Sequence, residues 1–395
     1  MTNKYYTPPP PQQQQLKVLL VLDQYDNENN GTTITARRLA EGLKKVGCDV
    51  RIVSTGKEQD NKFIVKSLNF PPIIENIIRS QGMQFAAADK DVLYRAINWA
   101  DFVHFIMPFW LSIEGVKIAK ELKKPHTAAF HVQPQNITYS IGCGRAKWPN
   151  EILYSVMKNY FYKYFRHIHC PSQFIANQLK QHKYDAKLHI ISNGVDNNFT
   201  YIKNKKPDEL KEKIVILMIG RLSKEKRQDV LINAVYKSKY TNKIQLIFAG
   251  NGPLKNKYKK LSKNLKYAPI FGFYSQKELI HVISYSDLYV HTADVEIEAI
   301  SCIEAFSCGL VPIIANSVQS ATSQFALDER SLFTSGNYIE LSKKIDYWLD
   351  NPNELFKQGC AYAEYGKKFM HSVCVQKMLL MFKEEMEDFK ALDLD

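Results

Sequence analysis

Short, continuously apolar runs alternate with segments of helical spacing along most of the chain, and this alternation predicts an α/β fold. The runs expected to form strands are residues 17–22, 48–54, 102–106, 127–131, 214–219, 245–249, 287–291 and 311–315. Helical spacing follows the first run over 35–46 and the fifth over 228–238. Such short apolar runs are typical of parallel strands that are buried on both faces. Because the strand–helix order starts afresh in the second half, the pattern predicts two doubly wound, Rossmann-like domains in tandem.

Interruptions of this pattern indicate where the domains end. Residues 8–15 are four prolines and four glutamines, which predict a disordered tail. The alternation breaks again at Asn204–Asp208, so the linker is expected within 197–212. We therefore expect a tail over 1–15, an N-terminal domain over 16–200, a C-terminal domain over 201–370, and a C-terminal helix over 371–395 that could cross back to the N-terminal domain.

The chain shows no targeting or membrane-spanning pattern. Its N-terminus lacks the apolar core of a signal peptide, and no run approaches the ~18 apolar residues of a spanning helix. The seven cysteines include no C-x-x-C pair, which favours reduced thiols in the core over disulfides or a zinc site. We expect a cytoplasmic protein.

Positive charge is concentrated in the first half. Of the net charge of +13, residues 1–206 carry +12, from 28 basic and 16 acidic side chains, and residues 207–395 carry +1, from 25 and 24. Such asymmetry indicates an anionic partner, either a membrane surface or nucleic acid. The basic residues are dispersed, and no zinc-finger, helix-turn-helix or RNA-binding pattern accompanies them. The sequence therefore favours a membrane surface and predicts no nucleic-acid partner.

Chemically distinctive residues follow the predicted strands of the second half. Gly220 and Arg221 come directly after the strand at 214–219, with Lys226 in the same loop, and two cations above a strand end suit a diphosphate. A tight turn, Gly250–Pro253, follows the next strand. Each piece alone also occurs in solvated loops and ordinary turns.

A third loop carries two glutamates, Glu296 and Glu304, on either side of a predicted helix start. The N-terminus of a helix presents N–H groups to phosphate, although two glutamates at this spacing also occur by chance. Ligands of open α/β sheets bind at the carboxyl ends of strands. The order of all three loops therefore predicts one common site.

The segment 189–316 resembles the donor-binding half of the retaining glycosyltransferases of family four, whose GT-B fold places two Rossmann-like domains face to face across a central cleft. The motifs that carry the resemblance are Ile191–Asp196, Gly220-Arg221 with Glu225-Lys226, Gly250–Pro253, Phe271–Phe273, Glu296 with Glu304, and Cys308–Pro312. A weaker likeness extends from Lys17 onward.

The resemblance implies roles for the loop residues. Arg221 and Lys226 would hold the diphosphate of a sugar nucleotide, and Glu296 would lie at the transferred sugar. Glu304 would accept hydrogen bonds from the ribose hydroxyls, which suits a carboxylate. The residues that would complete the donor site are Gly220, Gly250, Gly252, the backbone N–H groups of Ala299 and Ile300 at the phosphates, and Phe273 and Tyr274 beside the base.

Three residues of the first half match the family as well. Gly31 and Thr32 match a glycine-containing loop after the first strand, and His131 matches a histidine near the reacting centre. Without the resemblance, His131 would be interpreted as a hydrogen-bonded histidine at a strand end.

The sequence departs from the family pattern at two places. Ile297–Ala299 replaces the usual Gly-Phe-Gly, and Arg227 replaces the glycine that normally follows Glu225-Lys226. The resulting Glu-x-Glu-Ala-x-Ser-Cys-x-Glu pattern resembles a subgroup of bacterial lipid glucosyl- and galactosyltransferases. The contacts to the sugar are therefore expected to differ more than the contacts to the diphosphate.

The family also implies the reaction course. We expect a front-face displacement that retains the anomeric configuration, in which the leaving phosphate helps to accept the acceptor proton, with no protein nucleophile. The two Asp-x-Asp matches, Asp89–Asp91 and Asp393–Asp395, do not follow strands, so no metal site is expected at the donor, and the enzyme is expected to need no metal or other cofactor.

Two basic, aromatic stretches are candidates for the acceptor side. The first spans 62–79 and the second 145–166, and both combine apolar bodies with cationic tips, as proteins that lie on anionic bilayers do. The residues expected to contact the membrane or acceptor are Lys62, Phe63, Lys66, Phe70, Arg79 and Trp148. In the second stretch, Leu153, Met157, Tyr160 and Tyr164 are also spaced as the core face of a helix, and this spacing favours a core helix over membrane contact there.

Together these features predict an enzyme that transfers glucose or galactose from a UDP-sugar to a membrane lipid such as diacylglycerol or ceramide, at the inner face of the plasma membrane. Two alternatives stay open at this stage. The acceptor could be a saccharide of the cell envelope, or the chain could bind sugar nucleotide or lipid without catalysis.

Overall fold

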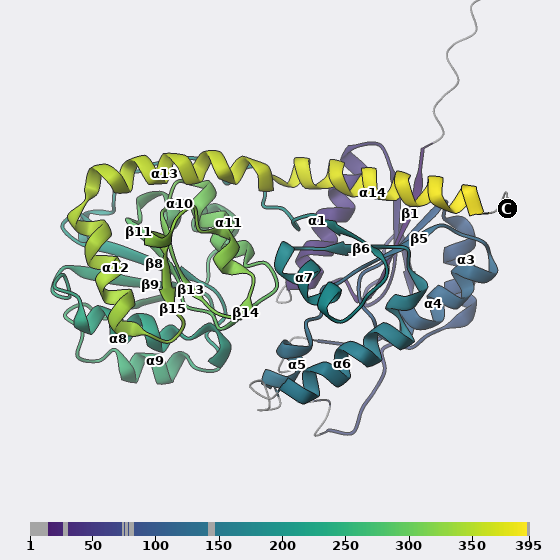
Figure 1. The fold of residues 1–395 in the computed structure, drawn as a ribbon, viewed down its shortest axis with the longest axis horizontal. Helices are drawn as coiled ribbons and strands as arrows, with labels where there is room; N and C mark the ends of the chain where they lie inside the picture. The colour runs from purple at the N-terminus through teal and green to yellow at the C-terminus, as the bar shows by residue number, and fades with distance from the viewer. Residues whose placement is uncertain are drawn as a thin grey trace, which may run out of the picture. The chain divides into compact units, whose positions relative to one another are not determined.

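The computed structural model describes residues 15–26, 31–72, 75, 78, 83–140 and 147–392. The chain divides into two compact units, Met1–His126 together with Glu385–Asp395, and Thr127–Glu384. Two parallel sheets flanked by helices follow one another along it (Figure 1). The domain boundaries expected from the sequence stay a prediction.

The first sheet has seven parallel strands in the order β3-β2-β1-β4-β5-β6-β7. Its strands are β1 (Lys17–Gln24), β2 (Asp49–Thr55), β3 (Lys62–Ile64), β4 (Phe102–Phe105), β5 (His126–Ala129), β6 (His167–Cys170) and β7 (Lys187–Ile190). The helices of this half are α1 (Gly31–Lys45), α3 (Lys90–Trp99), α4 (Trp110–Glu121), α5 (Pro134–Ser140), α6 (Lys147–Tyr160) and α7 (Gln173–Gln181). Strand β1 pairs with β2 on one side and β4 on the other, which explains its burial along nearly its whole length.

The second sheet has six parallel strands in the order β10-β9-β8-β11-β13-β15. They are β8 (Ile214–Ile219), β9 (Ile244–Ala249), β10 (Ile270–Gly272), β11 (Leu288–His291), β13 (Pro312–Asn316) and β15 (Leu332–Thr334), and β12 (Val295–Glu296) pairs separately with β14 (Gln319–Ser320). The helices are α8 (Gln228–Lys237), α9 (Lys255–Leu261), α10 (Gln276–Tyr285), α11 (Ile300–Ser307), α12 (Tyr338–Asp350), α13 (Pro352–Gly366) and α14 (His371–Leu392). Helices α8 and α12 pack against one another, as do α11 and α13 (Figure 1).

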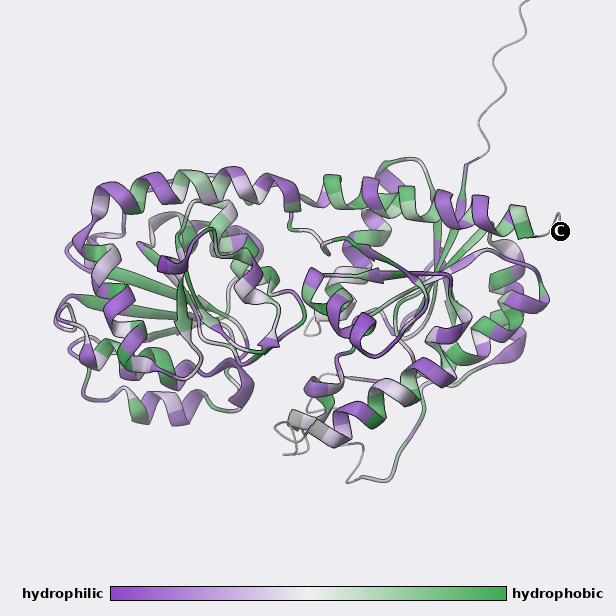
Figure 2. Ribbon diagram, viewed as in Figure 1, coloured by the Kyte–Doolittle hydropathy of each residue, from purple (hydrophilic) through white to green (hydrophobic). Residues whose placement is uncertain are grey.

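The apolar runs form the interior of both sheets. In Figure 2 the hydrophobic colour concentrates on the strands of the second sheet, whereas the surrounding helices carry both polar and apolar residues. One core of buried side chains in the second half includes Phe248, Tyr289 and Trp348. Burying apolar surface on both faces of a sheet stabilises it by roughly 25 cal/mol for each Å² removed from water. The two doubly wound domains predicted from the pattern are confirmed.

Local signals set the helix starts. The hydroxyl of Ser275 accepts a hydrogen bond from the backbone of Glu278, whose side chain accepts one from Ser275, and this capping box begins α10. Asp89, one of the Asp-x-Asp carboxylates, caps α3 by accepting a bond from Val92 N at 3.1 Å. The second Asp-x-Asp, Asp393–Asp395, lies outside the described residues.

The core interpretation of the stretch around α6 is wrong for two of its residues. Tyr160 and Tyr164 are exposed, and the buried aromatic residues of this stretch are instead Tyr154, Phe161, Tyr162 and Phe165. Apolar residues occur all around this helix, so the spacing did not decide which face packs inward.

Candidate active site

The loops after β8 and β9 are bonded to one another at the carboxyl edge of the second sheet. Gly220 N donates to Ala249 O at 2.9 Å, Gly250 N donates to Gly272 O at 2.7 Å, and Leu222 N donates to Asn251 O at 3.0 Å. Backbone bonds of this kind fix the shape of both turns. The loop with Gly220 and the turn with Gly250 therefore form one rigid rim.

Two glycines are required because the backbones of these turns approach one another closely. A Cβ on Gly250 would lie 2.1 Å from Gly220 O, and a Cβ on Gly252 would lie 2.4 Å from Leu222 O. Gly250 also has a φ of +155°, which residues with a side chain rarely adopt. Gly220 has a φ of +149°, but a Cβ there would meet nothing nearer than the side chain of Lys226, at 3.8 Å. A side chain at Gly250 would therefore displace the backbone of the Gly220 loop.

A partly buried ion pair lies at the centre of the site. Lys226 Nζ pairs with Glu296 Oε1, and His291 Nε2 lies 3.1 Å from the same oxygen. Burial alone would raise the pKa of Glu296, but Lys226 and then His291 outweigh burial and lower this pKa to about 2. The carboxylate is therefore charged, and the Lys226 cation is held above the strand ends, as expected for a group that meets a diphosphate.

A chain of hydrogen bonds continues behind this pair. His291 Nδ1 lies 2.9 Å from Tyr289 Oη, and Tyr289 Oη donates to Ser301 Oγ at 3.2 Å. Both aromatic residues are fully buried on β11, two positions apart and hence on one face of the strand. Neither was predicted as a site residue. The sequence did contain a sign of them, because Tyr289 and His291 are polar rings at alternate positions of an otherwise apolar strand.

The loop before α11 presents a helix start to the same region. Ala299 adopts the left-handed conformation with φ +67°, and α11 begins at Ile300. The first N–H groups of a helix have no partner inside it, so those of Ala299 and Ile300 remain the expected phosphate donors. Glu304 is buried one turn further along α11.

The side chain of Arg227 forms ion pairs within the protein. The residue also adopts the left-handed conformation, with φ +55°. Its guanidinium donates to Asp229 at 3.2 Å and to Asp294 at 3.1 Å. The carbonyl oxygens of Lys226 and Arg227 both lie 2.8 Å from Thr292 Oγ1, which fixes the turn that carries Lys226. Arg221 is exposed in the same loop, and its carbonyl accepts a bond from Gln228.

Glu298 is a buried acid that was not predicted as a site residue. Its carboxylate accepts hydrogen bonds from Asn193 N at 3.1 and 3.2 Å. Burial raises its pKa to about 7, despite the opposing hydrogen bonds from Ser192 and Asn193. One residue earlier, Ile297 O accepts a bond from Ser172 Oγ at 2.7 Å. Glu298 thus fastens the Ile191–Asp196 loop to the loop that carries Glu296.

His131 is buried, with its ring centre 5.3 Å from that of His169. Burial and then the neighbouring His169 lower its pKa to about 3. The imidazole is therefore neutral at physiological pH and can donate or accept a hydrogen bond without carrying charge.

The remaining donor residues lie as follows. Phe273 is largely exposed and Tyr274 is half-buried after β10, so both stay candidates for contact with a base. Gly31 and Thr32 form the first turn of α1, in the other compact unit. The structure brings Lys226 and Glu296 into contact and joins the loops of Gly220 and Gly250, as the sequence order suggested.

One predicted acceptor residue requires correction. The side chain of Lys62 is buried and pairs with Asp26 at 2.9 Å, so it does not face a membrane. The remaining members of the predicted set are Phe63, half-buried beside Trp99, Phe70, half-buried beside Phe85, the exposed Lys66 and Trp148, and Arg79, which lies outside the described residues.

Known proteins are similar to this chain along most of its length. Alpha-monoglucosyldiacylglycerol synthase of Streptococcus pneumoniae is 25% identical, covering 76% of this chain and 71% of its own. The structure of HepE from Anabaena in complex with UDP and glucose has a TM-score of 0.71 at 14% identity, covering 94% of this chain and 100% of its own. The catalytic domain of cholesterol-alpha-glucosyltransferase from Helicobacter pylori is 48% identical over 40% of this chain and 99% of its own, with a TM-score of 0.39.

Two family models match in succession and together span most of the chain. The model described as Glycosyltransferase Family 4 matches residues 29–199, and the model described as Glycosyl transferases group 1 matches residues 200–369. Both agree with the two parallel sheets and with the resemblance noted in the sequence. The chain therefore belongs to the glycosyltransferases of family four and is a hexosyltransferase with the GT-B fold.

Proposed function

We propose that the enzyme transfers glucose or galactose from a UDP-sugar, with retention, to the hydroxyl of a membrane lipid such as diacylglycerol or ceramide. The enzyme works from the inner face of the plasma membrane, to which it binds peripherally. The relative from Streptococcus pneumoniae, named as a synthase of a glucosyl lipid, supports this acceptor class. Among the described residues, no helix is both long and apolar enough to cross a bilayer.

The observation that carries the lipid acceptor is a row of exposed apolar side chains on α6. Trp148, Ile152, Val156 and Tyr160 are 71%, 53%, 44% and 66% exposed, and each is four residues from the next. Residues at this spacing form one ridge on a helix. A contiguous exposed apolar ridge marks a surface for a membrane or another apolar partner. We name these four residues the α6 ridge.

Cationic and aromatic groups continue beyond the α6 ridge. Tyr164 is exposed four residues after Tyr160, and Lys163 Nζ lies 5.1 Å from the centre of the Tyr164 ring. Rings and lysines together are typical of proteins that insert shallowly into the headgroup region of anionic bilayers. The net charge of +12 within residues 1–206 also favours binding to an anionic bilayer. A lipid surface explains both the apolar ridge and the charge.

The donor side supplies the chemistry. Lys226 neutralises the charge that develops on the departing diphosphate, and Glu296 keeps the lysine in place before the donor arrives. Preorganised charges of this kind stabilise a transition state because they do not reorganise during the reaction. The leaving phosphate accepts the proton of the lipid hydroxyl on the same face, so no nucleophile from the protein is needed.

Vesicle binding tests the α6 ridge. Trp148→Ser combined with Ile152→Ser should weaken binding to vesicles of phosphatidylglycerol and phosphatidylcholine by at least about tenfold, because two large apolar side chains no longer leave water. Phe356→Ser on α13, with a 64% exposed side chain, is the matched control and should bind as the wild type does. Equal binding by the ridge variant and the control would refute the membrane role.

The acceptor itself is identified by its product. Purified enzyme is incubated with UDP-glucose, UDP-galactose or GDP-mannose and with diacylglycerol, ceramide, a sterol or soluble oligosaccharides, and the products are measured by mass spectrometry. The proposal requires a glycolipid product from a UDP-sugar. Products formed on oligosaccharides alone would replace it with transfer to a cell-envelope saccharide.

A further inference from the structure

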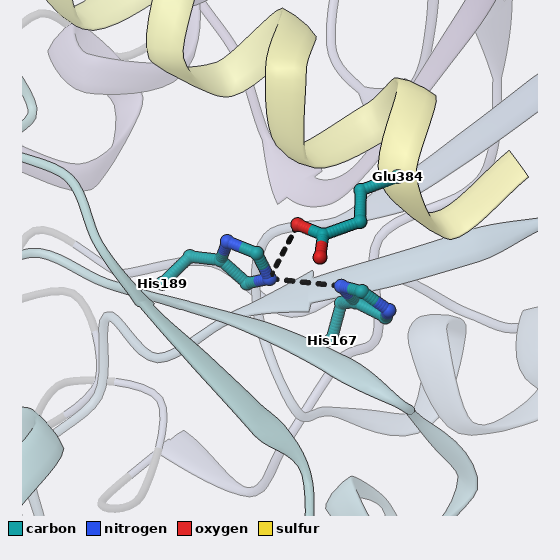
Figure 3. Close-up of side chains that lie close together, drawn as sticks. All are labelled: His167, His189 and Glu384. Carbon is teal, nitrogen blue, oxygen red and sulfur yellow. Dashed lines mark hydrogen bonds and ion pairs between the residues drawn. The ribbon is translucent and has the colours of Figure 1, made fainter. Parts of the chain in front are cut away.

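Two histidines and a glutamate from three elements meet on one face of the first sheet. His167 is the first residue of β6, His189 lies in β7, and Glu384 reaches them from α14 (Figure 3). Strands β6 and β7 are parallel neighbours, with His167 opposite Lys187 and His169 opposite His189. Residues two apart on a strand share a face, so both histidines project from the same side. We name His167, His189 and Glu384 the His–His–Glu cluster.

The cluster has the dimensions of a metal site. His167 Nδ1 lies 2.8 Å from His189 Nε2, and that nitrogen lies 3.8 Å from Glu384 Oε2. All three potential ligand atoms lie within 4.8 Å of one another. Zinc bonds of 2.0–2.2 Å in tetrahedral geometry separate neighbouring ligand atoms by about 3.4 Å, and the two measured distances lie on either side of this value. The third pair of ligand atoms, those of His167 and Glu384, lies within 4.8 Å, so side-chain adjustments of at most about 1.4 Å would bring all three separations to this value.

The chemistry and the exposure of the three groups fit the same ligand. The imidazole of His167 is buried, that of His189 is mostly buried, and the carboxylate of Glu384 is about one-third exposed. Two imidazoles and one carboxylate are a donor set that zinc prefers, and solvent at Glu384 can supply a fourth ligand. One of the two facing ring nitrogens carries the hydrogen of their hydrogen bond. When both nitrogens bind the metal, this hydrogen moves to the other nitrogen of the same ring, which changes the tautomer of that ring and not its charge.

We propose that His167, His189 and Glu384 bind a divalent transition-metal ion of the zinc type, and that this ion fastens α14 to β6 and β7. The cluster lies at the start of β6, whereas Lys226 and Glu296 follow strands of the other sheet. The metal therefore stabilises the fold and takes no part in sugar transfer. The proposal does not depend on the identity of the donor or acceptor.

Lys187 distinguishes a metal site from an ordinary polar contact. Its ammonium pairs with Glu384 Oε1, the carboxylate oxygen that does not face His189. A positive charge at this place opposes a divalent cation at the other oxygen. If the cluster binds metal, removing Lys187 strengthens binding. If the cluster only anchors α14 through hydrogen bonds and the Lys187 pair, the same change weakens the anchor and affects no metal.

The test uses the full chain, with any histidine tag removed and Cys360, which is exposed, replaced by serine. The protein is stripped with a chelator and titrated with Zn²⁺ by calorimetry, and with Co²⁺ by absorption. We expect one ion per chain, the visible bands of four-coordinate cobalt, and a higher Tm with Zn²⁺ than without it. Glu384→Gln and His189→Gln should each weaken Zn²⁺ binding by at least about tenfold.

Two further variants complete the experiment. Lys187→Met should tighten Zn²⁺ binding severalfold. His182→Gln is the matched control. His182 pairs with Glu151 at 3.0 Å but lies outside the His–His–Glu cluster, so this variant should leave Zn²⁺ binding unchanged. The proposal is overturned if no single ion binds at micromolar Zn²⁺, or if Glu384→Gln binds Zn²⁺ as tightly as its parent. Because Glu384 is partly exposed, this variant keeps the test valid even if replacing the more buried histidines prevents folding.

Discussion

Replacing Glu298 by glutamine should stabilise the folded protein at alkaline pH and leave it little changed in acid. The carboxylate is buried, and Asn193 N donates to both of its oxygens. Glutamine has nearly the same shape and carries no charge that must be removed from water. Its amide also brings a donor close to Asn193, whose buried Oδ1 has no hydrogen-bond partner in the described part of the chain.

The size of the effect follows from the pKa of Glu298. Burial raises this pKa from 4.5 to about 7, so the folded state favours the protonated acid. The stability that the protonated form contributes is fully present below pH 4.5 and is lost as the pH rises through about 7. At 1.36 kcal/mol for each tenfold change in proton affinity, the loss amounts to about 3 kcal/mol. Glutamine does not undergo this loss.

Thermal unfolding across pH measures the difference. The Tm of Glu298→Gln minus that of the wild type should increase by roughly 6–12 °C between about pH 4.5 and pH 8, since about 1 kcal/mol shifts the Tm of a domain of this size by 2–4 °C. Burial also raises the pKa of Asp23 to about 7, but Asp23 is present in both proteins and cancels. Glu296→Gln is the control, because the pKa of Glu296 is about 2 and its pH effect falls below this window. A constant Tm difference for Glu298→Gln would refute the reasoning.

Two further predictions concern the donor loops. Lys226→Met should lower turnover at saturating UDP-sugar by at least about a hundredfold, because it removes the cation that we propose to meet the diphosphate; initial-rate measurements check this, and turnover within tenfold of the wild type would contradict it. Gly250→Ala should lower the Tm more than Gly220→Ala, since both glycines have positive φ but only at Gly250 would the new Cβ meet backbone, 2.1 Å from Gly220 O. Calorimetry compares the two variants, and equal losses would show that the close contact is unimportant.

The sequence pattern predicted strands that are apolar throughout and missed strands whose apolar run is interrupted or exposed. Strand β8 has the limits expected for it, because Ile214–Ile219 is apolar throughout and ends at Gly220. Strands β6 and β7 were not predicted. The sequence of β6 contains two histidines, and β7 is an edge strand whose residues are exposed or half-exposed. Without a continuous apolar run, neither produced the signal of a buried parallel strand.

The residues of the candidate site also fall into those that the sequence predicted and those that it missed. The loops with Lys226 and Glu296 were predicted because each follows a recognisable strand. Glu298 was not, since its partner Asn193 lies 105 residues away and only the folded chain brings them together. Lys62 was assigned to the surface from its charge, whereas its ion pair with Asp26 allows it to be buried. Contacts between distant residues carry the information that a local pattern lacks.

Helices α8 and α11 each begin after a residue, Arg227 and Ala299, that has a side chain and yet adopts the left-handed conformation. For such residues this conformation costs roughly 1–2 kcal/mol relative to the right-handed one. At Arg227, bonds to Asp229 and Asp294 offset the cost. No described hydrogen bond through a side chain can do the same for Ala299, because alanine has no polar group. Ala299 is thus where an engineer seeking a more heat-resistant enzyme would first introduce glycine, because removing its Cβ relieves this cost in the turn that begins α11.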